Sequence, residues 1–493
     1  MLQRDRAVPI WGWADAGEKV TVTFAGQTKT VTADAAGTWR VQLDVMPACK
    51  QNRPLVITGI THIITIENVL VGEVWLCGGQ SNMEYSLYGS LDKSVKIDQS
   101  FADPLIRHLT VPQSRCSNLP LRDISDKPIS WALATPAGGV AAFSATGYFF
   151  ARELARELDV PIGLISDNWG GTRIEPWICL EGFARVPELK KMTDEIVKFS
   201  GPYYAGMKAY YAEMQAWSTQ AQQAIAANRT PTPAPALTEP FRRPFSSCQL
   251  YNSMIAPLVG YGMRGVIWYQ GESNGDEGLE YADKTRALVE GWRHVWGQGE
   301  FPFYWVQLAA CHHSDPNKPE GGDGWSRLRE AQLRALSIPH TGMAVAIDIG
   351  EAENIHPKKK QDVGLRLARW ALAKDYGKNV PFSGPLYQKC IIEGAKIRII
   401  FDHADSGLMV GIKQGTEPTK VDPAGKVKWI AIAGADKKFV WADAVLDGKT
   451  LVVSSPQVPK PVVVRYAFAT NPEGANLYNR DGLPASPFRT DTE

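Results

Sequence analysis

The chain has 493 residues, a length that exceeds one ordinary domain and predicts two to four of them. Hydrophobic residues make up 44% and charged residues 21%, a globular composition that excludes a mostly disordered chain. Lys and Arg number 53 against 52 Asp and Glu, so the net charge of +1 excludes a global field that recruits nucleic acid or an anionic membrane.

The sequence shows no segment typical of membrane insertion or export. No apolar run approaches the roughly 18 residues of a membrane span. The first six residues, MLQRDR, lack the apolar core of a signal peptide, so we expect none in this chain. The seven cysteines contain no CxxC pair, and we therefore expect neither a disulfide framework nor a structural zinc site.

The first 70 residues predict a small β-domain. Apolar and polar residues alternate over Val20–Phe24, and a Gly-containing turn separates this segment from Thr28–Thr32. A further short strand is expected at Thr38–Leu43. Short strands separated by Gly and Asp are typical of a β-sandwich, so residues 1–70 are assigned to a sandwich-like N-terminal domain.

From Val71 the pattern changes to that of an α/β domain. Val71–Leu76 is a nearly continuous apolar run, as expected of a strand buried on both faces. Ser144 is placed to cap a helix that ends at Leu158, and the strand Pro161–Ile165 follows. Strands and helices continue to alternate: strands at Val266–Tyr269, Phe303–Leu308 and Met343–Ile347, and helices at Tyr281–Trp296 and Trp325–Leu336. Residues 71–380 therefore predict a layered α/β domain with a mainly parallel sheet.

Residues 185–245 interrupt this domain with a polar helix at Lys208–Ala227 and a Pro-rich segment at 230–235. After Gly377 the β pattern returns and continues to the end of the chain. Its strands are expected at Lys396–Phe401, Lys428–Ala433, Leu451–Ser454 and Val462–Ala467. Residues 381–493 are assigned to a C-terminal β-domain.

Loops rich in Gly and polar residues follow the predicted α/β strands, where open sheets bind their ligands. In the first loop, GGQSNM at 78–83, Ser81 is placed to be an exposed nucleophile whose own N–H helps to bind an oxyanion. The alternative role for Ser81 is an ordinary helix N-cap. His356, in the loop after Met343–Ile347, is a candidate base, with Glu353 as its orienting acid and Asn354, Asp348 or a backbone carbonyl as substitutes.

Two further loops offer residues for an oxyanion hole. Gln270, in the loop QGESN, can donate its side-chain N–H, and Glu272 points to a polar pocket. The same loop contains GESNG, a match to the GxSxG nucleophile motif, which makes Ser273 a rival to Ser81. The loop WGGTRIEPW at 169–177 supplies a Gly pair whose backbone N–H groups can face a developing negative charge.

Other polar groups receive simpler interpretations. We expect residues 311–315, CHHSD, to form a solvated loop and not a metal site, because adjacent residues on a strand end point in opposite directions. Lys358–Lys360 predicts a solvated helix start. Glu272 with Glu353 would suit a glycosidase, but that scheme leaves Ser81 and His356 without a role.

Four motifs occur in this order along the chain: GGQSNM, WGGTRIEPW, WYQGESN and NIHPKKKQDVGLRLA. In this combination the chain resembles carbohydrate esterases of the sialate O-acetylesterase type, in the SGNH (GDSL-like) hydrolase superfamily. The resemblance spans most of the chain, including both β flanks. It implies an SGNH-type three-layer domain. It also implies that Ser81 is the nucleophile and His356 the base, with Glu353 as the acid. Ser273 then becomes a supporting residue.

The resemblance further implies an oxyanion hole made by the N–H groups of Ser81 and Gly171, with Gly170 as the alternative glycine, and by Gln270. Residues that border the substrate are expected to be Arg173, Trp177 and Glu272. Arg173 would pair with a sialate carboxylate or be held by Glu175 or Glu272, whereas a neutral sugar would stack on Trp177. No metal or cofactor is required.

The expected partner is an acetylated carbohydrate, from sialic acid or from a plant polysaccharide such as acetylated xylan or xyloglucan. A non-catalytic carbohydrate-binding protein is the rival from another class, and the joint presence of Ser81, Gln270 and His356 argues against it. The resemblance implies a periplasmic or secreted protein. The sequence does not define the oligomeric state.

Overall fold

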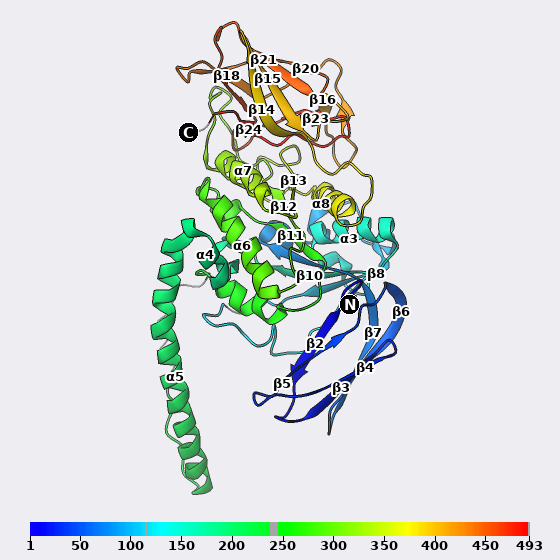
Figure 1. Ribbon diagram of the computed structural model, residues 1–493, viewed down its shortest axis with the longest axis vertical. Coiled ribbons are helices and arrows are strands. Elements are labelled where there is room, and N and C mark those ends of the chain that lie inside the picture. The colour runs from blue at the N-terminus through cyan, green and yellow to red at the C-terminus, as the bar shows by residue number, and fades with distance from the viewer. Residues whose placement is uncertain (114–115, 237–244, 492–493) are drawn as a thin grey trace.

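The computed structural model describes residues 1–113, 116–236 and 245–491. Figure 1 shows β-strands at each end of the molecule and a central region in which helices surround a sheet. The long helix α5 (Lys190–Ala226) projects away from this central region.

The central sheet follows the order β13-β12-β11-β7-β10-β8-β9. Neighbouring strands are parallel from β13 to β8, and β9 pairs with β8 in the antiparallel direction. The α/β class is therefore confirmed, with a mixed sheet. In sheet order the strands are β13 (Thr341–Val345), β12 (Phe303–Gln307), β11 (Gly265–Tyr269), β7 (Ile63–Gly79), β10 (Ile162–Asn168), β8 (Asp103–Thr110) and β9 (Ala132–Ala134).

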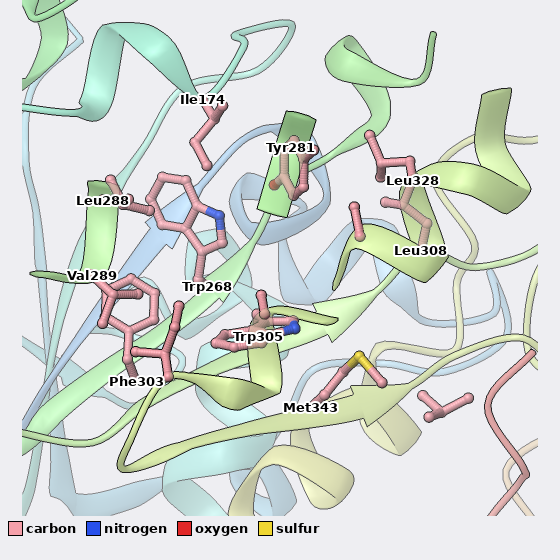
Figure 2. Close-up of a cluster of buried hydrophobic side chains, with 14 of the residues drawn as sticks. Ile174, Trp268, Tyr281, Leu288, Val289, Phe303, Trp305, Leu308, Leu328 and Met343 are labelled. Atoms are coloured by element: carbon pink, nitrogen blue, oxygen red, sulfur yellow. The ribbon is translucent and has the colours of Figure 1, made fainter. Parts of the chain in front are cut away.

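Helices cover both faces of this sheet. On one face lie α3 (Ala145–Leu158) and α8 (Lys360–Lys374), and on the other α4 (Leu180–Arg185), α6 (Glu280–Trp296) and α7 (Gly324–Arg334). Successive strand residues alternate between the two faces, as the pleat requires. Trp268 belongs to the core under α6, whereas Tyr269 belongs to the core under α3 and α8. Figure 2 shows Trp268 with Leu288 and Val289 of α6 close by.

The expected cap of α3 is confirmed, because the Ser144 side chain accepts a hydrogen bond from the N–H of Gly147. Strand β8, in contrast, was not expected from the sequence. It begins with Asp-Pro and contains Arg107 and His108, both buried. Charged and imidazole side chains do not give the continuous apolar run that predicts a buried parallel strand.

The N-terminal region joins the central sheet through β7. This strand is 17 residues long, and the domain boundary predicted at residue 70 falls inside it. The first part of β7 pairs with β6. Strands β2 and β5 form a separate two-stranded sheet, and both sheets contribute side chains to one apolar core. These elements are β1 (Leu2–Gln3), β2 (Val8–Trp13), β3 (Lys19–Phe24), β4 (Gln27–Thr32), β5 (Thr38–Leu43) and β6 (Cys49–Thr58).

The helix expected at Lys208–Ala227 begins earlier in the structure, at Lys190. It passes through Pro202, which follows a glycine, a pair that ordinarily predicts the end of a helix. The Pro-rich segment at 230–235 is irregular, and residues 237–244 of the expected interruption lie outside the described part of the chain. Among the described helices, none is long and apolar enough to cross a membrane.

The C-terminal region consists of antiparallel strands, in agreement with the expected β pattern. It is tied to the central domain by Arg329 of α7, which is fully buried and donates to the carbonyls of Ala469 and Thr470. These strands are β14 (Leu386–Glu393), β15 (Lys396–Asp402), β16 (Leu408–Ile412), β17 (Lys420–Val421), β18 (Ile430–Ala433), β19 (Phe439–Trp441), β20 (Asp443–Asp447), β21 (Thr450–Ser454), β22 (Val463–Tyr466), β23 (Leu477–Asn479) and β24 (Phe488–Arg489).

Candidate active site

Ser81 lies at the carboxyl end of β7, in the middle of the sheet. Gly79 has a φ of +133°, and a Cβ there would lie 2.2 Å from the carbonyl oxygen of Tyr269, so only glycine fits this turn. The short helix α1 (Ser81–Glu84) follows, with Gln80 at its N-cap position. Ser81 is therefore not an N-cap, and its hydroxyl is available for another partner.

That partner is His356. The Ser81 Oγ lies 2.8 Å from His356 Nε2, a distance at which the hydroxyl donates to an unprotonated ring nitrogen. His356 comes from the loop after β13, three positions from β7 in the sheet, so its loop crosses β12 and β11 to reach Ser81. The ring of Tyr85 stacks on the imidazole, with centroids 5.8 Å apart and planes at 12°. The structure thus brings together the two principal residues predicted from the sequence.

The surroundings of His356 keep its imidazole neutral. Burial lowers its pKa from the ordinary value, the Lys360 ammonium lowers it further, and the Glu84 carboxylate opposes both. Because the ordinary value is about 6.5 and the net shift is downward, the neutral base is the main form at pH 7. A neutral imidazole is the form that can take a proton from the serine.

The prediction that Glu353 orients His356 is wrong. The Glu353 side chain is 85% exposed, and its carboxylate lies 2.5 Å from Nε2 of His313. A tight turn, in which Asn354 N–H donates to the Glu351 carbonyl, directs Glu353 away from the imidazole. Asn354 contacts the backbone of His356, because its Oδ1 accepts from the histidine N–H at 2.9 Å.

The other substitute, Asp348, holds Arg366 through both carboxylate oxygens, at 2.6 and 2.7 Å. Both side chains are buried, so this carboxylate is fully engaged in the core. Within the described residues, no hydrogen bond joins a carboxylate to the His356 ring. The arrangement is therefore a Ser–His pair and not a hydrogen-bonded triad.

We predict that Glu353→Ala keeps kcat for 4-nitrophenyl acetate within about twofold of the unmodified chain, because an exposed ion pair contributes little. The matched control is His313→Ala, which removes the other partner of the same pair. Steady-state acetate release measures both variants. A fall of about 10⁴-fold in Glu353→Ala alone, as for loss of a triad acid, would contradict this geometry.

Of the two candidate glycines, Gly170 is the one that lies against Ser81. A Cβ placed on Gly170 would lie 3.3 Å from Ser81 Cβ, whereas one on Gly171 would meet no atom within 4 Å. Gly171 instead has a φ of +73° and makes the turn. The Gly170 N–H donates to Oε2 of Glu84 at 2.7 Å. A carboxylate oxygen thus lies against an N–H group that neighbours Ser81.

The side-chain N–H groups of Gln270 are engaged by residues of other loops and of its own, which corrects its expected role in the oxyanion hole. Its side chain is fully buried. The Nε2 group donates to Gln80 Oε1, to the Thr172 carbonyl and to Asn274 Oδ1, at 2.8 to 3.1 Å. Its Oε1 accepts from the Tyr281 hydroxyl. Gln270 therefore ties neighbouring loops together, and its N–H groups are already engaged.

Glu272 also faces the interior and not the substrate. Its Oε1 accepts a hydrogen bond from Asn82 Nδ2, and its Oε2 is buried without a partner among the described residues. Burial raises the pKa of this carboxyl. Sequence reasoning missed its companions: Asn82 directly follows Ser81, and Lys360, expected in a solvated helix start, is fully buried. The only sequence signal for a role in the site was position: Asn82 lies in the motif GQSN and Lys360 in the motif IHPKKK.

Trp177 is a core residue, which corrects its expected role as a stacking platform. Its side chain has no exposed surface, and its ring packs edge-on against Trp268 at 6.0 Å. Arg173 is half exposed, but its guanidinium pairs with Glu175 and Glu277 and donates to the Ser273 carbonyl. Of the two partners weighed from the sequence, Glu175 is present and Glu272 is not.

No metal site is evident: the described residues contain no group of three or more His, Cys, Asp or Glu side chains placed to hold a metal ion. A cavity of about 670 Å³ opens next to Glu84; Ser81 and His356 are not among the residues that line it. Its lining mixes polar groups with apolar surface and includes Tyr88, Gln113 and Asn168. This size and polarity suit a sugar unit or two.

The family model described as carbohydrate esterase, sialic acid-specific acetylesterase, matches residues 203–373. Sialate O-acetylesterase from Mus musculus is 31% identical over 97% of this chain and 90% of its own length. That from Rattus norvegicus is 31% identical over 77% of this chain and 72% of its own length. A crystal structure described as a novel carbohydrate acetylesterase from Xanthomonas citri is 35% identical, with a TM-score of 0.79, over 100% of this chain and 97% of that one.

The α/β fold and these comparisons together show that the protein is an ester hydrolase. More particularly, the chain belongs to the sialate O-acetylesterase family of carbohydrate esterases.

Proposed function

We propose that the chain hydrolyses O-acetyl esters of sugars through an acetyl-enzyme on Ser81, with His356 as general base and acid. The observation that carries this proposal is the 2.8 Å contact between Ser81 Oγ and His356 Nε2. The nucleophile after β7 and the histidine after β13 also support an SGNH-type assignment for the α/β domain.

In the first half-reaction, His356 Nε2 takes the Ser81 proton while Oγ attacks the acetyl carbonyl carbon. The oxyanion accepts hydrogen bonds from the N–H groups of Ser81 and Gly170, which requires the exposed Glu84 carboxylate to leave Gly170. The imidazolium then protonates the sugar oxygen as the carbon–oxygen bond breaks. The displaced Glu84 charge remains near the imidazolium, which it stabilises.

In the second half-reaction, His356 deprotonates a water molecule that attacks the acetyl carbonyl of the acetyl-enzyme. The tetrahedral intermediate collapses, Ser81 Oγ leaves and recovers its proton from His356, and acetate departs. Every proton that moves is carried by His356 Nε2. The scheme needs no redox partner.

We propose an acetylated sugar as substrate, bound with its ring in the cavity beside Glu84. The mammalian relatives are named for sialates, which carry a carboxylate. Because Glu175 and Glu277 already neutralise Arg173, that residue adds little affinity for such a carboxylate. This observation favours a neutral acetylated polysaccharide as the second candidate substrate.

Labelling and substrate comparison test this proposal. A fluorophosphonate is expected to modify Ser81, detected by mass spectrometry of the peptide that contains it. Acetate release is then measured from O-acetylated sialic acid and from acetylated xyloglucan. Sugar binding with neither labelling nor acetate release would indicate a carbohydrate-binding protein, and release of reducing sugar without acetate would indicate a glycosidase.

A further inference from the structure

We infer that Lys360, together with Asn82, is a positioning residue for His356: the two side chains hold the backbone carbonyls of Ile355 and Pro357, the residues on either side of the histidine, in place of a carboxylate on its ring. The inference rests on the proposed function, since it concerns the same Ser–His pair. It assigns a role in catalysis to a lysine that touches neither substrate nor reacting atoms.

The contacts form a short chain between the nucleophile and the base. Asn82, next to Ser81, donates from Nδ2 to the carbonyl of Ile355 at 2.9 Å. The Lys360 ammonium donates to the carbonyl of Pro357 and to Asn82 Oδ1, each at 2.6 Å. The carbonyls before and after His356 are therefore fixed to the residue that follows Ser81. This arrangement sets the height and direction of the imidazole relative to the hydroxyl.

The orientation of the Asn82 amide is also defined. Its Nδ2 donates to the Ile355 carbonyl, which can only accept, so Oδ1 must face Lys360. The Lys360 ammonium lies 5.0 Å from the centroid of the Tyr85 ring, which itself stacks on His356. Lys360 thus supports the imidazole both through the backbone and through its aromatic neighbour.

The location of Lys360 is otherwise unfavourable. It is the first residue of α8, where the helix dipole disfavours a positive charge, and it is fully buried. A buried ammonium persists only where hydrogen bonds and charges compensate for lost water. Burial lowers its pKa to about 7, against the opposing effect of Glu272 and Glu351. A residue that costs stability at such a position is expected to serve the site.

The ammonium charge also acts on the base directly. It lowers the pKa of His356, after the larger effect of burial, while Glu84 raises it. The charged groups that face this pair are therefore Glu272, Glu351 and Glu84. Removal of the lysine charge would remove one of the two effects that lower the pKa of His356 and leave that of Glu84, so this pKa would rise. The base would then become protonated at a higher pH than in the unmodified chain.

The test is Lys360→Met in the full chain, with Lys358→Met as matched control, an exposed lysine two residues away. We expect Lys360→Met to lower kcat for 4-nitrophenyl acetate about 10²-fold, as for a misplacement of about 1 Å, with KM changed less than about threefold. The acid limb of kcat/KM is expected to move to higher pH. Lys358→Met is expected to match the unmodified chain in all three quantities.

Asn82→Ala is the second variant, and it tests the positioning role if Lys360→Met does not fold. It removes the link to Ile355 and one hydrogen bond of Lys360 but no charged side chain, so kcat should fall with a smaller shift of the acid limb than in Lys360→Met. Unchanged kcat in either folded variant would overturn the inference, as would an equal loss from Lys358→Met. If Ser81→Ala stays inactive while Lys360→Met is normal, only the positioning role fails. Full activity of Ser81→Ala would instead overturn the proposed function itself.

Discussion

Ser81→Ala is expected to lower kcat for 4-nitrophenyl acetate by about 10⁶-fold, the loss typical of removing a serine nucleophile. Ser81 Oγ is the hydroxyl that hydrogen-bonds to His356, and without it the imidazole has no bound group to activate. Acetate release at saturating substrate measures the effect. Thermal unfolding of the variant confirms that the fold is retained.

Ser273→Ala is the control, because Ser273 occupies the rival GxSxG match. In the structure its backbone is engaged, through its N–H to Gln80 Oε1 and its carbonyl to Arg173. Within the described residues, no hydrogen bond joins the Ser273 hydroxyl to a histidine. We expect this variant to keep kcat within about threefold of the unmodified chain. Activity retained in Ser81→Ala and lost in Ser273→Ala would reverse the assignment.

Arg329→Met is expected to lower the free energy of unfolding by about 3–5 kcal/mol, because it leaves several buried carbonyls without donors. The guanidinium donates to Leu308 and Ala309 after β12, and to Ala469 and Thr470 of the C-terminal region, at 2.7 to 2.8 Å. Burial lowers its pKa to about 10, so it remains charged at pH 7. Urea denaturation followed by tryptophan fluorescence measures the change.

Arg327→Met provides the matched control, since Arg327 lies two residues earlier on α7 and is exposed. Its effect should stay within about 0.5 kcal/mol. Equal effects of the two substitutions would show that Arg329 does not link the domains. Arg329→Met should also weaken catalysis, because Arg329 holds the segment after β12, and that segment packs against the loop that carries His356. The contact is close: a Cβ on Gly350 of this loop would lie 2.0 Å from the Ala310 carbonyl oxygen.

The sequence was most informative where the signal is local. Apolar runs predicted the strands β7, β10, β11, β12 and β13, and apolar periodicity predicted the helices α3, α6 and α7, because these patterns follow directly from backbone geometry. The rule that parallel sheets bind ligands at their carboxyl edge then placed Ser81 and His356 in one site. Strand β8 escaped this reasoning because buried Arg107 and His108 mask its apolar pattern.

Within the site, the chemical type of a residue did not reveal its direction. Glu353 precedes His356 by three residues, yet a turn directs it to solvent and to His313. Gln270 and Trp177 have the groups expected of a substrate site, but both are buried among contacts from distant segments. Such contacts depend on how loops far apart in the chain meet, which no local pattern encodes.

The sequence by itself determined the α/β order, the serine and the histidine, because motif and periodicity are properties of short segments. Only the tertiary structure decided that Gly170 neighbours Ser81 and that no carboxylate bonds to the His356 ring within the described residues. It also decided that Lys360, in a run that predicts solvent exposure, lies buried against Asn82. The physical reason is that burial and hydrogen bonding at this site come from loops after β7, β11 and β13, which only the folded sheet brings together.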